Sequence, residues 1–254
     1  MSLIRRAATL MLIGFCIDAC APPPKPIRRP GWEPATDVTT LLQGGTASLG
    51  HIKTLTAAAR VTIADEQTTQ SLSASFQYLP PELLRIDVRG PLFRHVLTAV
   101  FDADTLWSLA EGRLSRFAAR RGLVDLLDLD LMGDDPRIAL LGLMDSTRTG
   151  DVVDVEYPRA DRAVAVIREA PGGQRRLWVD ILSGWIVAEE RIDASGQRRW
   201  RRELSDHARV SDSEIFLPRH VRIESRGRSL DIQYDEWRVN RDLSRANLFK
   251  GLEH

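Results

Sequence analysis

The sequence predicts a mainly β protein of the α+β class, an antiparallel meander of about thirteen short strands with a few short helices. Three observations support this prediction. Apolar residues alternate with polar ones in many short segments, which is the pattern of strands with one buried face. Turn sequences such as "DEQ", "EG", "PGG", "LSG" and "ASG" separate these segments. One leucine-rich stretch, 123–143, interrupts the alternation and predicts helices.

The first residues have the layout of a secretory signal. Arg5 and Arg6 form a positive head, residues 7–17 are almost wholly apolar, and the small residue Ala19 precedes Cys20. The apolar run falls well short of the ~20 residues that a membrane-spanning helix needs. We therefore expect residues 1–19 to be a signal peptide.

A cysteine directly after such a run resembles the lipobox of bacterial lipoproteins. In that family the cysteine receives a diacylglycerol thioether, the signal is cleaved before it, and the new amine is acylated. Ile17, Ala19 and Cys20 match the pattern, whereas Asp18 stands where a small or apolar residue is usual. The resemblance implies that Cys20 is the lipidated first residue of the mature protein, and we expect no cofactor besides this covalent lipid. The alternative is an ordinary signal peptide with two incidental cysteines, Cys16 and Cys20.

Residues 20–35 are interpreted as a tether. Six prolines and three basic residues stand between positions 21 and 34, with Trp32 as the only aromatic residue. Such a segment is extended and cannot bury a core, so it would hold a folded domain, 36–254, away from a membrane. Ala21 stands where, in Gram-negative lipoproteins, an aspartate tends to retain the protein in the inner membrane. Because Ala21 replaces that aspartate, the sequence favours the outer membrane, with the domain facing the periplasm.

Composition indicates a neutral chain without a disulfide. Lys+Arg and Asp+Glu both number 35, so no net charge attracts nucleic acid. If Cys20 is lipidated, Cys16 leaves with the signal and no disulfide can form in the oxidising compartment. The domain must then be held by its core, and a chain of this size buries roughly 70% of its unfolded surface. We expect a monomer.

The domain is predicted to begin with a broken amphipathic helix over 36–50. Apolar residues recur there at near-helical spacing, Thr36 or Asp37 can serve as N-cap, and the pair Gly44-Gly45 weakens the middle.

The strands follow in chain order. The predicted segments are 55–63, 72–78, 84–88, 95–101, 105–110, 113–118, 152–157, 163–169, 174–180, 185–192, 198–205, 219–224 and 229–237. Because neighbouring strand residues point to opposite faces, the alternation assigns some apolar residues to an inner face and Arg85, Asp87 and Asp231 to the outer face. The inner-face residues are Val61, Phe76, Ile86, Leu97, Val179 and Ile232.

The leucine-rich stretch is predicted to form two short apolar helices. The run Asp134-Asp135-Pro136 divides it, and Pro136 suits the first turn of the second helix.

The order of these pieces resembles that of the LolB-like outer-membrane lipoproteins. In that family a strand runs into a Gly-Pro-Leu-Gly loop, then a hairpin, a leucine-rich helix and a Leu-Gly-Leu segment. The matching pieces here are Gly90-Pro91-Leu92, 123–127 and Leu141-Gly142-Leu143, within a similar stretch that spans 85–127 and beyond. The segments "IFLPRHVRIES" and "LDIQYDEWRVN" resemble the closing strands of LolA and LolB. Phe93 departs from the pattern, because the family's loop has a second glycine there.

The resemblance implies an incomplete antiparallel β-barrel of about 11–13 strands wrapped over short helices. It also implies a hydrophobic cavity that takes acyl chains, lined by the inner-face residues named above. One apolar sheet face and a leucine-rich plug against it fit this fold independently. The alternation alone leaves open whether these residues line a cavity or fill a core.

A protruding apolar loop contacts the membrane in LolB-like proteins. The resemblance assigns this role to the loop formed by Gly90, Pro91, Leu92 and Phe93. Basic residues flank the loop and can meet phosphate headgroups. The alternative is that Leu92 and Phe93 fold back onto the sheet edge.

These observations predict an outer-membrane lipoprotein that binds acyl chains of lipoproteins or lipids and passes them to the inner leaflet of the outer membrane. A periplasmic LolA-like carrier is a candidate partner. Two alternatives stay open. One is a structural or assembly lipoprotein that uses the fold as a protein-binding scaffold, with its cavity filled by side chains. The other is a soluble periplasmic lipid carrier, which requires that Cys20 is not lipidated.

Residues for catalysis or metal binding are few, so we expect no enzyme, no catalytic residue and no metal site. No histidine has a second histidine at metal-ligand spacing, and His95 is interpreted as structural. The aspartates of 125–135 lack the ligand spacing and central glycine of a calcium loop. No nucleophile elbow, phosphate loop or dinucleotide-binding glycine pattern is present. The arginines of 198–202 are expected to lie on a solvated strand and to pair with Glu189 and Glu190. The alternative is that they form a basic rim that contacts lipid headgroups.

Overall fold

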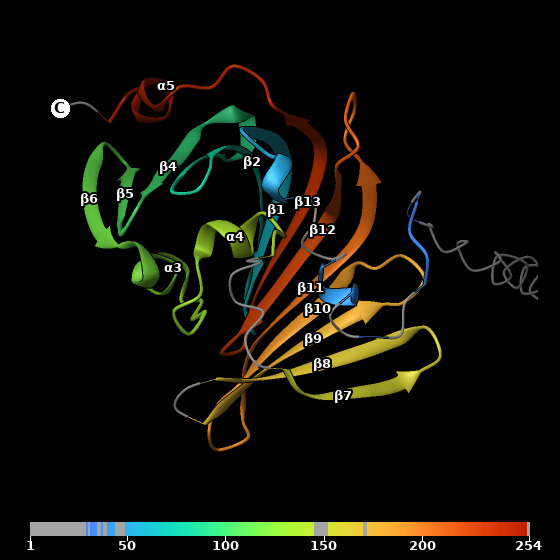
Figure 1. Cartoon of the computed structure of the whole chain (residues 1–254). Coiled ribbons are helices and arrows are strands. Elements are labelled where there is room, and N and C mark those ends of the chain that lie inside the picture. Colours follow the sequence, from blue (N-terminus) through green and yellow to red (C-terminus); the bar gives the residue numbers. More distant parts are fainter. Residues whose placement is uncertain are drawn as a thin grey trace, which may run out of the picture.

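The computed structural model describes residues 29, 31–34, 37, 40–43, 49–144, 152–169 and 172–252. Within these ranges thirteen strands form one antiparallel sheet, which confirms the predicted fold class and strand number. The strand order is β6-β5-β4-β3-β2-β1-β13-β12-β11-β10-β9-β8-β7. In the described part of the chain β6 and β7 are therefore edge strands, and the sheet curves around the helices without closing into a barrel (Figure 1).

Each predicted strand overlaps one observed strand. The strands are β1 (Leu55–Ala64), β2 (Thr69–Leu79), β3 (Leu83–Arg89), β4 (His95–Asp102), β5 (Thr105–Ala110), β6 (Arg113–Ala118), β7 (Val152–Arg159), β8 (Arg162–Glu169), β9 (Gly173–Asp180), β10 (Ile186–Ile192), β11 (Arg198–Arg209), β12 (Phe216–Ser225) and β13 (Arg228–Val239).

The sheet consists of two meanders, β1–β6 and β7–β13. They are joined by the pairing of β1 with β13. Val61 of β1 stands opposite Leu72 of β2 on one side and Ile232 of β13 on the other. The sequence predicted a meander, but the pairing of β1 with β13 was not predicted. It creates a continuous concave face that collects the apolar side chains of both meanders.

Two helices plug the concave face, as the leucine-rich stretch predicted. They are α3 (Ala119–Leu127) and α4 (Pro136–Leu140). α4 begins at Pro136, after Asp135 accepts a hydrogen bond from the backbone N–H of Arg137 at 2.9 Å. Figure 1 shows both helices on the inside of the curved sheet. No helix in the described ranges has the length and apolar character needed to cross a bilayer.

The helix predicted over 36–50 is only partly described. Residues 40–43 are helical, and Asp37 accepts a hydrogen bond from the backbone N–H of Thr40 at 2.8 Å, as an N-cap does. A 3-10 turn, η2 (Leu49–His51), precedes β1. The rest of this prediction lies outside the described residues.

A second, smaller core covers part of the convex face, and the sequence did not predict it. Helix α5 (Arg245–Phe249) packs Leu248 against Leu83 and Val100. Arg85 lies on this face, as predicted, but its guanidinium is not solvated. It donates to the backbone carbonyls of Leu248 and Lys250 at 2.9 and 2.7 Å, because the C-terminal segment covers it.

Candidate functional site

An apolar cavity of about 240 Å³ lies between strands β1–β4 and β13 on one side and the helices on the other. Among the described residues that line it, Gln70 is the one polar residue. The lining residues are Val61, Ile63, Gln70, Leu72, Ala74, Phe76, Ile86, Val88, Val96, Leu97, Ala99, Phe101, Leu123, Leu126, Leu127, Leu140, Leu230 and Ile232. A wall this apolar offers almost no hydrogen bonds, so it suits a hydrocarbon and disfavours a polar ligand, which would lose its hydration without compensation.

The structure gathers most of the residues that the alternation assigned to the inner face. Val61, Phe76, Ile86, Leu97 and Ile232 all line this cavity. Val179 lies on the inner face as expected, but the expectation that it lines the cavity was wrong. Its side chain is fully buried, but it lies on β9 in the second meander and does not reach the cavity. Alternation decides the face of the sheet that a residue occupies, whereas its position across thirteen strands depends on the pairing.

The cavity is closed at one end and accessible at the other. At the closed end Phe76, Phe101 and Leu140 are at most 3% exposed. At the other end Gln70 and Val96 are exposed. In an antiparallel sheet the β1–β2 turn and the β3–β4 loop lie at the same end, and both rim residues are close in sequence to these connections. The cavity therefore opens at the end of the sheet that carries the β3–β4 loop.

The β3–β4 loop projects a leucine into solvent. It contains a 3-10 turn, η3 (Pro91–Phe93), and Gly90 closes it by donating its N–H to the carbonyl of Arg94 at 2.8 Å. Leu92 is 93% exposed and has φ 56°, a left-handed conformation that costs a leucine roughly 1–2 kcal/mol. Leu92 thus does not fold back onto the sheet edge. The side chain of Phe93 lies outside what the structure describes.

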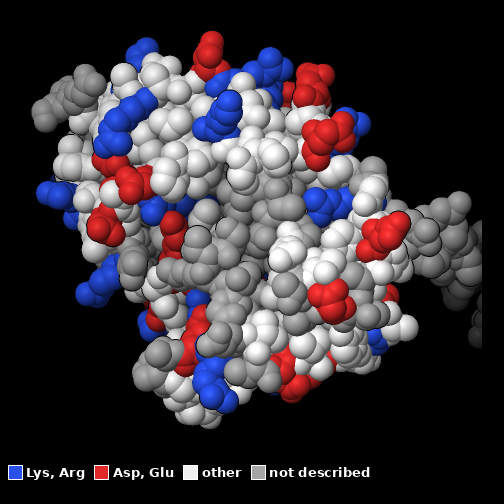
Figure 2. All heavy atoms as spheres, in the orientation of Figure 1, with Lys and Arg blue, Asp and Glu red and all other residues white. Residues whose placement is uncertain are grey.

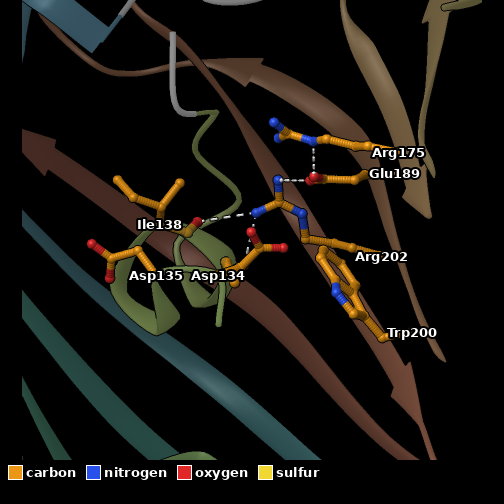
Figure 3. A pocket seen from close by; sticks show the side chains of 8 residues that line it. Asp134, Asp135, Ile138, Arg175, Glu189, Trp200 and Arg202 are labelled. Carbon is orange, nitrogen blue, oxygen red and sulfur yellow. Dashed lines mark hydrogen bonds and ion pairs between the residues drawn. The ribbon is translucent and has the colours of Figure 1, made fainter. Parts of the chain in front are cut away.

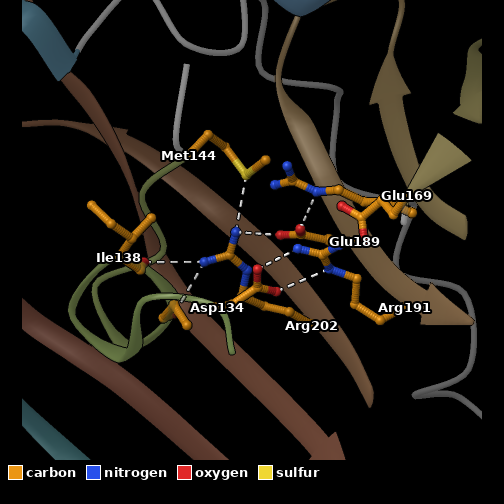
Figure 4. A network of polar contacts seen from close by, with 9 residues as sticks. Asp134, Ile138, Met144, Glu169, Glu189, Arg191 and Arg202 are labelled. Carbon is orange, nitrogen blue, oxygen red and sulfur yellow. Dashed lines mark hydrogen bonds and ion pairs between the residues drawn. The ribbon is translucent and has the colours of Figure 1, made fainter. Parts of the chain in front are cut away.

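Hydrogen bonds from the sheet hold α4 and its following turn in place. The hydroxyl of Tyr234 on β13 donates to the carbonyl of Leu140 at 2.8 Å. Arg202 on β11 donates to the carbonyls of Ile138 and Ala139 at 3.1 and 3.2 Å (Figure 4). These carbonyls belong to the last turn of α4, where a positive charge is favourable. One wall of the cavity is therefore fixed to the sheet.

Arg202 belongs to a buried network of ion pairs under the second meander (Figure 4). Glu189 accepts from Arg175 at 2.5 Å and from Arg202 at 2.7 Å. Arg191 pairs with Asp134, which lies just before α4, and with Glu169. Burial lowers the pKa of Arg202, although the charge of Glu189 opposes this shift. Among the described residues of the network, three arginines face three acids, so their charges balance.

A polar chamber of about 20 Å³ lies beside this network (Figure 3). It is lined by Asp134, Asp135, Ile138, Ala139, Arg175, Glu189, Trp200 and Arg202. The indole N–H of Trp200 and the Nε–H of Arg202 are buried and have no hydrogen-bond partner among the described residues. The chamber has room for about one water molecule and none for an acyl chain. Of these two spaces, only the apolar cavity is large enough for part of an acyl chain.

Sequence reasoning missed this network, although a signal was present. Arg175 is in phase with Leu177 and Val179, so the alternation itself places it on the inner face. Arg202 was expected on a solvated strand, and this was wrong, because its side chain is 2% exposed. Arg201, one residue away, does pair with Glu190 on the opposite face. The alternative interpretation of these arginines, a basic rim, therefore loses Arg202 to the interior.

The remaining candidate residues are placed as follows. His95 contacts the hydroxyl of Thr98 through Nε2 at 2.8 Å. Cys20 lies outside the described residues, as does most of the predicted tether. Trp32, near the end of that tether, donates its indole N–H to the carbonyl of Ile181 at 3.0 Å and packs against Gly184. Across the ranges that the structure covers, no three His, Cys, Asp or Glu side chains gather as a metal ion requires.

An open antiparallel sheet curved over short helices, with an apolar cavity on its concave face, defines the LolA/LolB-like fold. A LolA superfamily protein from Nitrosomonas europaea matches it with a TM-score of 0.60 at 11% identity, over 86% of this chain and 100% of that one. A DUF1329 family protein from Desulfovibrio piger matches with a TM-score of 0.61 at 11% identity, over 84% and 96% of the two chains. No protein-family model and no curated protein matches the sequence. At these identities the likeness establishes the fold alone.

Proposed function

We propose that this protein is a lipid-anchored protein of the outer membrane that binds an acyl chain and takes part in the transfer of lipoproteins or lipids there. The observation that carries the proposal is the apolar cavity, which is open at one end. A core that merely filled the sheet would close over this space, because protein interiors leave few voids larger than a water molecule. The cavity therefore favours a lipid-binding protein over a scaffold that uses the same fold.

The energetics of an acyl chain require transfer by contact. Burying one methylene gains ~0.8 kcal/mol, so about ten buried carbons gain on the order of 8 kcal/mol. Release of such a chain into water is correspondingly slow. When the chain passes directly to a bilayer, the free energy lost on leaving the protein is nearly regained, since both environments are apolar. A binding protein of this kind has to touch its donor and acceptor during transfer.

The exposed loop supports such contact. Leu92 presents an apolar side chain at the end of the sheet where the cavity opens, and Arg89 and Arg94 flank it. Charged lipid headgroups attract basic residues near a membrane surface. The face in Figure 2 shows acidic and basic side chains interspersed, and the whole chain has no net charge, so membrane attraction would depend on local basic residues such as these.

Acyl binding is tested by native mass spectrometry of the full chain purified from cells. We expect acyl species to co-purify with the wild type. The double variant Ala74→Leu with Ala99→Leu fills the cavity and should lose them, whereas Ala58→Leu, on the exposed face of β1, should retain them. Thermal unfolding verifies that all variants fold. Equal acyl content in the cavity-filled and control variants would refute the proposal.

Membrane contact is tested with liposomes. Replacing Leu92 with glutamate should leave folding intact, because the side chain is 93% exposed, and should weaken liposome association. Tyr157→Glu is the matched control, since Tyr157 is 52% exposed on edge strand β7. If both variants bind liposomes as the wild type does, Leu92 is not a membrane contact.

A further inference from the structure

A second hollow adjoins the mouth of the cavity. This hollow, the loop groove, is lined by Gly90, Pro91, Leu92, Arg94, His95, Val96, Ala110 and Glu111 and encloses about 830 Å³. Val96 lines both the loop groove and the apolar cavity. A Cβ atom on Gly90 would lie 3.2 Å from Val96 Cγ2 and 4.0 Å from Leu72 Cδ2, so the loop packs directly on two residues of the cavity wall.

A β-bulge places Val96 at this junction. Val88 of β3 stands opposite Leu97, and the next residue, Arg89, stands opposite His95. Val96 is thus the extra residue of β4 and has no partner on β3. Its side chain is 40% exposed, whereas Ala99, three residues further along the strand, is buried against the cavity. Val96 therefore forms the threshold between an apolar interior and an open surface groove.

The size of the cavity limits what it can enclose. An apolar cavity of ~150 Å³ in a protein core holds benzene, with six carbons. By proportion, a cavity of about 240 Å³ holds about ten carbons. A second chain does not fit beside the first. A single chain of ~15 carbons, about half the thickness of a bilayer's hydrocarbon core, would leave about five carbons outside the cavity.

We infer that the ligand is one acyl chain with an anionic end, whose distal carbons fill the cavity and whose proximal carbons cross Val96 into the loop groove beside Arg94. This inference rests on the proposed function and deepens it, because it assigns the entry route and the position of the polar end. The ionisable residues of the groove are Arg94, His95 and Glu111. His95 is engaged with Thr98, so Arg94 is the group that can pair with a carboxylate or a phosphate.

The inference predicts that the affinity for an acyl compound rises with chain length until the cavity is full and then levels off. The test titrates the full chain carrying Cys20→Ser with saturated fatty acids of 6 to 16 carbons and with a lysophosphatidylglycerol, by displacement of a fluorescent apolar probe. Affinity should rise about fourfold per methylene up to roughly ten carbons and then level off. A rise that continues unchanged to 16 carbons would overturn the size limit. Stronger binding of the lysolipid than of the matching fatty acid would identify a phosphate as the polar end.

Variants at the threshold test the route. Val96→Trp and Gln70→Trp narrow the mouth and should each weaken binding at least tenfold, whereas Val187→Trp, on the opposite face, should not. Gln70 is exposed, so its variant is expected to fold even if Val96→Trp does not. Arg94→Glu should weaken binding of fatty acids more than binding of alkanols of the same length.

The outcomes separate this inference from the proposed function. If fatty acids bind and the cavity-filled variant abolishes binding while the threshold variants do not affect it, the cavity binds lipid but the route past Val96 is wrong. If no acyl compound displaces the probe from the wild type, the proposed function fails and the route fails with it.

Discussion

Neutralising Glu189 should destabilise the protein strongly. The side chain is 2% exposed and lies between Arg175 and Arg202, which are 4% and 2% exposed. Glu189→Gln keeps the shape of the side chain but removes the negative charge that lies between two buried arginines. Removing one partner of a buried pair typically costs about 3–5 kcal/mol, a large part of the 5–15 kcal/mol that holds a domain folded. For a domain of this size the melting temperature should fall by about 6–20 °C.

The assay is urea unfolding of the full chain followed by circular dichroism. Glu214→Gln is the matched control. It removes the same charge from the Arg209–Glu214 pair, in which the glutamate is 83% exposed, and should change stability by no more than about 1 kcal/mol. Adding Arg202→Met to Glu189→Gln removes the excess charge and should recover part of the loss. A stability of Glu189→Gln within 1 kcal/mol of the wild type would refute the reasoning, because it would show that the network is not desolvated.

Three further predictions concern separate parts of the molecule. His207 stacks on Trp185 at 4.6 Å, and burial lowers its pKa from 6.5 to about 4. Below pH 6.5 the unfolded chain therefore binds more protons than the folded chain, so the free energy of unfolding should fall by about 2 kcal/mol between pH 7 and pH 5. Chemical denaturation at both pH values should show a smaller fall for His207→Gln than for the wild type. Gly142 has φ 66°, and a Cβ there would lie 2.6 Å from Pro218. Gly142→Ala should cost about 2–4 kcal/mol in chemical denaturation, against about 1 kcal/mol for Gly112→Ala, which has φ 75° and open space around it. Metabolic labelling with a fatty-acid probe should mark the wild type and not Cys20→Ser, and equal labelling would contradict lipidation at Cys20.

The strands, their faces and the helical plug could be predicted from the sequence because each depends on short-range periodicity. Alternation over a few residues placed Ile86 inside and Asp87 outside, and the leucines after Leu123 changed the period from two to that of a helix. The exposed Leu92 was also predictable, since Gly90-Pro91 ends a strand and leaves a large apolar residue in a turn.

What only the tertiary structure decided depends on contacts between segments far apart in the chain. The pairing of β1 with β13 sets which inner-face residues meet, so Val61 and Ile232 share the cavity and Val179 does not. The covering of Arg85 by the C-terminal segment and the burial of Arg202 follow from the same kind of contact. Local sequence encodes the face that a side chain occupies, because the pleat of a strand is local. The neighbours on that face are set by strand order, and strand order is a property of the whole sheet.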